Sequence, residues 1–140
     1  MKSALISIVT FAFASALLAQ QPADPVLYSS GLPRYPAIAL NAHITGEVTA
    51  EFSLDASGNV ASVQILSGPP LLRLETEHNI RTCKFGQDPG LDDHSYKTTF
   101  TYRLSGRLVS PSRVPRLTVT VDSFRHIEII SDVQNIPARY

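Results

Sequence analysis

Residues 46–68 read GEVTAEFSLDASGNVASVQILSG, and this stretch decides the fold because two strand patterns flank a turn. Apolar and polar residues alternate without exception from residue 46 to residue 54, which predicts a half-buried antiparallel strand. Residues 55–59 are turn formers, and Gly58 is free to adopt a positive φ angle. A second strand is expected over residues 60–67. The stretch therefore predicts a β-hairpin.

A helix is predicted directly after this hairpin, over residues 70–82. Gly68-Pro69-Pro70 ends the second strand, and proline is tolerated in the first turn of a helix. Apolar residues then recur at helical spacing and define a buried stripe, in which a threonine is the polar exception. The predicted stripe consists of Leu72, Thr76, Ile80 and Cys83. Good helix formers also predict a short helix within residues 36–43.

Three further strands are predicted after a polar loop at residues 87–95. Alternation marks residues 96–104, 117–121 and 127–129, and residues 122–125 join the last two strands in a hairpin. The order β-β-α-β followed by a hairpin predicts the α+β class, with a small antiparallel sheet packed on one helix and a C-terminal β-hairpin. The residues expected to form the core are Val48, Phe52, Leu72, Ile80, Cys83 and Phe85.

The first 19 residues are typical of a cleaved secretory signal peptide. Lys2 precedes an apolar run at residues 4–18, and small residues end that run before Gln20. The alternative is an uncleaved inner-membrane anchor, but the run is shorter than the roughly 20 residues that a spanning helix needs. We therefore expect a secreted protein. Residues 20–33 contain three prolines and are expected to form an extended leader that is ordered late or not at all.

Composition limits the remaining function classes. A chain of 140 residues forms one domain. Twelve basic and twelve acidic residues give no net charge, which argues against nucleic-acid binding, and one Cys excludes an internal disulfide or a multi-cysteine metal site. The charges are uneven, because residues 20–101 carry five basic and nine acidic residues and residues 102–140 carry six and three. The basic tail indicates a solvated surface or, more specifically, a surface for binding or self-association.

The sequence offers no convincing catalytic set, so we expect no enzyme and no small-molecule cofactor. The motif Gly-x-Ser-x-Gly is absent, and Cys83 lies on the predicted apolar stripe, where a buried thiol is inert. A weaker alternative is a hydrolase or metal-binding protein built around His78, Asp92 and His94. These residues lack the close ligand spacing of known metal sites.

Together the predicted elements resemble the TonB C-terminal domain family. The resemblance is carried by Tyr35-Pro36, by residues 46–68, by the helix segment PPLLRLETEHNIRTCKF at residues 69–85, and by the strand at residues 96–104. It delimits a TonB-like domain at residues 34–104 and a C-terminal β-hairpin extension at residues 105–140. Cys83 stands where the family usually has Trp, and Asn79 stands where a small Ala is common.

The resemblance implies a periplasmic domain that binds the N-terminal segment of an outer-membrane receptor, or another envelope protein, by strand addition. The alternative is a structural or assembly protein of the envelope that forms a homodimer through the same fold. The added hairpin, residues 116–131, is expected either to leave the binding edge at residues 96–104 open or to cover it. The resemblance assigns partner binding to Tyr35, Pro36, Lys97, Thr99, Phe100, Thr101, Tyr102 and Arg103.

Overall fold

The computed structural model describes residues 24–86, 94–110 and 112–134. The predicted signal peptide, residues 1–19, lies outside the described residues, as do the first four residues of the predicted leader. In the described part of the chain the elements are β1 (Leu27–Ser29), α1 (Ala37–Asn41), β2 (Gly46–Leu54), β3 (Val60–Ser67), α2 (Pro70–Arg81), β4 (Lys84–Phe85), β5 (Ser95–Val109), β6 (Leu117–Ser123) and β7 (His126–Gln134).

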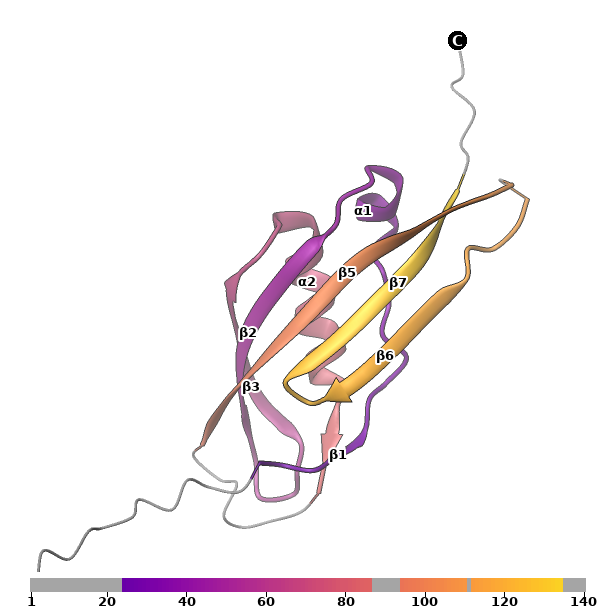
Figure 1. Cartoon of the computed structure of the whole chain (residues 1–140). Helices are drawn as coiled ribbons and strands as arrows, with labels where there is room; N and C mark the ends of the chain where they lie inside the picture. Colours follow the sequence, from indigo (N-terminus) through magenta and orange to yellow (C-terminus); the bar gives the residue numbers. More distant parts are fainter. Residues whose placement is uncertain (1–23, 87–93, 111, 135–140) are drawn as a thin grey trace, which may run out of the picture.

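The larger sheet has five strands in the order β3-β2-β5-β7-β6, and α2 packs on one of its faces (Figure 1). Strand β7 lies between β5 and β6 and runs parallel to β5, from the pair Thr99–His126 onwards. Strands β3, β2 and β5 are antiparallel as predicted, and so is the β6–β7 hairpin, but the hairpin joins β5 in parallel, so the five-stranded sheet is mixed. The reason lies in burial: β7 carries the fully buried Ile127 and Ile129, whereas β6 is almost wholly exposed. The more apolar strand of the hairpin takes the inner position.

Helix α2 confirms the helix predicted over residues 70–82. It begins with Pro70 in the first turn and ends at Arg81. Its buried face contains Leu72, Thr76 and Ile80, as the stripe predicts, and also Asn79. The short helix predicted within residues 36–43 is α1, so the described residues form two helices rather than one.

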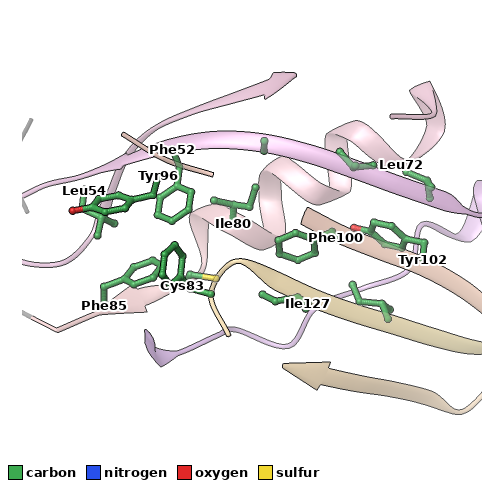
Figure 2. Close-up of a cluster of buried hydrophobic side chains, with 14 of the residues drawn as sticks. Phe52, Leu54, Leu72, Ile80, Cys83, Phe85, Tyr96, Phe100, Tyr102 and Ile127 are labelled. Atoms are coloured by element: carbon green, nitrogen blue, oxygen red, sulfur yellow. The ribbon is translucent and has the colours of Figure 1, made fainter. Parts of the chain in front are cut away.

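The core lies between α2 and the sheet, and the C-terminal hairpin contributes to it. Figure 2 shows Leu72 and Ile80 of α2 beside the aromatic side chains of β5, with Ile127 of β7 close by. In addition, Phe124 from the β6–β7 turn packs edge-on against Phe85 and Tyr96, at ring-centroid distances of 6.2 and 6.0 Å. The six residues expected in the core are all buried: Val48, Phe52, Leu72, Ile80, Cys83 and Phe85.

The predicted leader is extended, but its described part is ordered against the domain. Strand β1 pairs with β4 in a second, two-stranded sheet, and the Gly86 amide donates a hydrogen bond of 2.9 Å to the Val26 carbonyl. Asp24 forms an ion pair with Arg125 of the β6–β7 turn. In the folded structure, residues 24–33 of the leader are thus held against the domain. Leu27 explains this order, since it packs on the core.

Candidate functional site

Tyr35 and Pro36 bring the chain onto the sheet. Pro36 caps the N-terminus of α1. The Tyr35 hydroxyl donates a hydrogen bond of 2.6 Å to the Ile44 carbonyl, and its ring meets Tyr102 of β5 edge-on at 5.3 Å. Partial burial raises the pKa of Tyr35. Both residues therefore hold the segment before β2 in place, next to Tyr102 in the middle of β5.

A buried polar network surrounds Tyr102. The Thr76 hydroxyl donates to the Leu72 carbonyl at 2.8 Å, so the Tyr102 hydroxyl donates to the Thr76 oxygen at 2.9 Å. The amide nitrogen of Asn79 donates to the Tyr102 oxygen at 3.2 Å. Burial is the main cause that raises the pKa of Tyr102, to about 12. The network explains the polar residue in the buried stripe of α2.

Asn79 connects this network to the chain before α1. Its side-chain oxygen accepts a hydrogen bond of 3.1 Å from the Arg34 amide, and its side-chain nitrogen lies 3.3 Å from the Arg34 carbonyl. Asn79 is 2% exposed, so these bonds satisfy a buried polar group. The sequence pattern gave no role to Asn79. The sequence feature that could have indicated a role for Asn79 is its position as a polar residue one helical turn after Thr76.

The sheet edge that the resemblance assigned to partner binding is paired on both sides. From residue 99 to residue 102, β5 pairs with β2 on one side and with residues 126–129 of β7 on the other, and Arg103 pairs with Ile130 of β7 alone. Of the residues assigned to binding, Phe100 and Tyr102 are buried in the core, and Lys97, Thr99, Thr101 and Arg103 alternate with them on the opposite face. Side-chain bonds also join the strands, since Thr101 lies 3.0 Å from His126 and Arg103 lies 3.2 Å from Glu128. In the full chain, the β6–β7 hairpin therefore occupies the edge of β5 that the resemblance assigned to partner binding.

The outer edge of β6 is unpaired in the five-stranded sheet and lies on the same side as the assigned edge (Figure 1). The Asp132 amide donates to the Arg116 carbonyl at 3.0 Å, which fixes the phase of the ladder between β6 and β7. In an antiparallel ladder the bonded pairs alternate with non-bonded pairs. The backbone groups of Leu117, Val119 and Val121 therefore point away from β7. No proline or charged residue interrupts residues 117–121, so these five residues are open to strand pairing, and the charged Asp122 and a register shift follow them at the end of β6.

The described residues do not form the metal-binding or hydrolytic site that was considered around His78, Asp92 and His94. Asp92 lies outside them, and within them no three His, Cys, Asp or Glu side chains are grouped to hold a metal ion. Cys83 is 4% exposed, and burial raises its pKa to about 11, so its thiol is protonated at neutral pH. No helix of the described segments has the length and apolar character needed to cross a membrane.

The fold and this site define a small α+β domain with an exposed edge strand, which suits the binding of extended peptide segments. The chain belongs to the family described as Gram-negative bacterial TonB protein C-terminal, whose model matches residues 32–104. It is also similar to Protein TonB of Salmonella typhimurium (strain LT2), with 32% identity over 85 residues that make up 61% of this chain. The matched region covers 35% of that protein, so the chain spans about a third of the length of this relative. The family expected from the sequence is confirmed.

Proposed function

We propose that the protein is a periplasmic, non-enzymatic binding module of the TonB type. It binds an extended segment of an outer-membrane receptor, or of another envelope protein, by adding that segment as a strand to its sheet. The match of residues 32–104 to the family carries this proposal. The exposed edge of β6 supports it, because an unpaired edge supplies main-chain donors and acceptors to an incoming strand.

We place the added strand on β6 and not on β5. A peptide would reach β5 from residue 99 to residue 103 only after the hairpin had left, which would expose Phe124, Ile127 and Ile129. Each of these side chains contributes about 1.5–3 kcal/mol by its burial, which makes the displacement costly for a short peptide. The role of β5 in this proposal is to hold β7, and β7 in turn positions β6.

Synthetic peptides from the N-terminal segments of outer-membrane receptors of the same organism test the proposal. Addition of a binding peptide to the ¹⁵N-labelled protein should shift amide signals in residues 117–121 first. Val119→Pro removes one outward N–H and leaves the bonds from β6 to β7 in place, so this variant should lose the binding. Val119→Thr keeps the N–H and the β-branched shape, and it serves as the matched control. Unchanged peptide binding by Val119→Pro would contradict the assignment to β6, and a lack of binding to any receptor peptide would contradict receptor recognition.

Homodimer formation through β6 is a second candidate function, and the sequence of this strand favours it. If two copies of β6 pair antiparallel about Val119, Arg116 of each copy faces Asp122 of the other, and Thr118 faces Thr120. Opposite charges at directly paired positions stabilise antiparallel strands. Sedimentation equilibrium should then show that Arg116→Asp weakens the dimer and that the exchange Arg116→Asp with Asp122→Arg restores it. A protein that stays monomeric at high concentration would contradict this candidate.

A further inference from the structure

Three arginines lie on or beside the link between β5 and β6: Arg107 near the end of β5, Arg113 in the link and Arg116 just before β6. Figure 1 shows this link at the end of the sheet where β5 ends and β6 begins. Arg107, Arg113 and Arg116 line a pocket of about 360 Å³ there. All lining residues follow residue 104, so they lie outside the region that matches the family. Leu108, Val109, Ser110, Val114 and Asp132 complete the lining. We call this part of the molecule the arginine tip.

Within the described residues, no ion pair neutralises the positive charge of the arginine tip. None of the ion pairs within the described segments involves Arg107, Arg113 or Arg116. The carboxylate that lines the pocket belongs to Asp132, which is 8% exposed and accepts hydrogen bonds from the Ser105 hydroxyl and the Arg116 amide. Three arginines therefore line the pocket together with one carboxylate that is already hydrogen-bonded. The pocket keeps a positive charge and favours an anion.

Apolar side chains project beside these cations. Leu108 is 66% exposed and Val114 is 90% exposed, and both line the same pocket. Exposed aliphatic side chains at the end of a sheet contribute nothing to the core. Next to unpaired arginines they form an amphipathic surface, with cations and aliphatic groups presented together.

We propose that the arginine tip binds the surface of an anionic phospholipid bilayer. The arginines contact lipid phosphates, since the planar guanidinium binds a phosphate through two parallel hydrogen bonds. Leu108 and Val114 enter the boundary between headgroups and acyl chains. This interaction is independent of strand addition at β6. It would bring the domain next to a membrane through residues that follow the family domain.

Flotation of the full chain with lipid vesicles tests the proposal. The protein should float with vesicles of 70% phosphatidylcholine and 30% phosphatidylglycerol at low salt, should stay behind with pure phosphatidylcholine, and should dissociate as salt rises. Each basic residue near an anionic surface strengthens binding by roughly fivefold. A triple variant should therefore partition about 100-fold more weakly onto anionic vesicles; it carries Arg107→Gln, Arg113→Gln and Arg116→Gln.

A matched control removes the same charge elsewhere. The control variant carries Arg34→Gln, Arg73→Gln and Arg81→Gln, at one position before α1 and two positions in α2. It should bind vesicles within about threefold of the unmodified chain. Circular dichroism verifies that both triple variants fold. Equal losses in both variants, or no loss in the first, would overturn the proposal.

Two further measurements separate a bilayer from a small anion. Leu108→Ser with Val114→Ser leaves every charge in place and should weaken vesicle binding by about tenfold, because less apolar surface enters the bilayer. Inorganic phosphate at millimolar concentration should not displace the protein beyond its effect on ionic strength. Displacement by phosphate at constant ionic strength, together with unchanged binding by the serine variant, would show a site for free phosphate and overturn the bilayer assignment.

Discussion

Cys83 shows how one buried side chain couples stability to pH. Burial raises the pKa of its thiol from an ordinary value of 9.0 to about 11. The folded state therefore holds this proton more tightly than the unfolded chain does. The stabilisation is complete below pH 9 and is lost as the pH rises towards 11, at up to about 1.4 kcal/mol per pH unit. Tyr102 acts in the same direction between about pH 10 and 12.

Cys83→Ala should cost about 1–2 kcal/mol of unfolding free energy at pH 7, because it removes a small core group. The difference from the unmodified chain should narrow between pH 9 and pH 11, since the variant has no thiol to deprotonate. Urea denaturation at several pH values measures both effects. A difference that stays constant over this range, or fast labelling of the folded protein by a thiol reagent at pH 8, would show that Cys83 is exposed.

The Tyr102 hydroxyl donates to the Thr76 oxygen, so deletions of these two hydroxyls should not be additive. Tyr102→Phe leaves a Thr76 lone pair without a donor and an Asn79 N–H without its acceptor, and should cost about 1–3 kcal/mol. Thr76→Val should cost a similar amount. The double variant should cost clearly less than the sum, since no group of this pair is then left unsatisfied. A double-mutant cycle measured by urea denaturation tests this, and additive losses of unfolding free energy would contradict the hydrogen bond.

At the scale of the elements, the β2–β3 turn depends on one glycine. Gly58 has a φ of 79°, and a Cβ atom at this position would overlap the Phe85 carbonyl of β4. Gly106 has a similar φ of 73°, but open space surrounds it. Gly58→Ala should therefore cost more than about 2 kcal/mol, whereas Gly106→Ala should cost only about 1 kcal/mol of backbone strain. Equal melting temperatures for the two variants would show that the contact with β4 does not stabilise the turn.

The elements also show which parts of the fold the sequence could predict. Strands β2 and β3 match their predicted bounds because alternation over residues 46–67 is a local signal. The pairing of strands that are far apart in the sequence produces no such local signal. The parallel position of β7 depends on competition between two strands for the same neighbour, and β4 spans two residues, too few for a period. For the same reason the edge of β6 could be recognised as a candidate site only once β7 was placed on β5.

At the scale of the whole molecule, the C-terminal hairpin is part of one shared core. Ile129→Ala should cost about 2–5 kcal/mol, because Ile129 is fully buried between neighbouring strands. Ile130→Ala alters the next residue, on the opposite face, and should cost less than about 1 kcal/mol. Equal costs in chemical denaturation would show that the hairpin packs loosely.

A chain that ends at Ser105 loses the whole hairpin and exposes the edge of β5. We expect this shortened protein to be less stable and to self-associate through the exposed strand, or to bind receptor peptides more tightly than the full chain. Size-exclusion chromatography and peptide titration measure these outcomes. A monomer with unchanged stability and binding would show that residues 106–140 are an appendage.

The inner position of β7 also determines when the fold can be completed during synthesis. Residues 24–110 contain every other partner of β5, and β7 (His126–Gln134) comes later along the chain than all of them. At about 5–20 residues per second, β7 is synthesised seconds after β2 and β5. In any chain whose translation stops before β7, β5 presents a bare edge to proteases and to other unfolded chains. The last of the described strands therefore decides whether the sheet is completed.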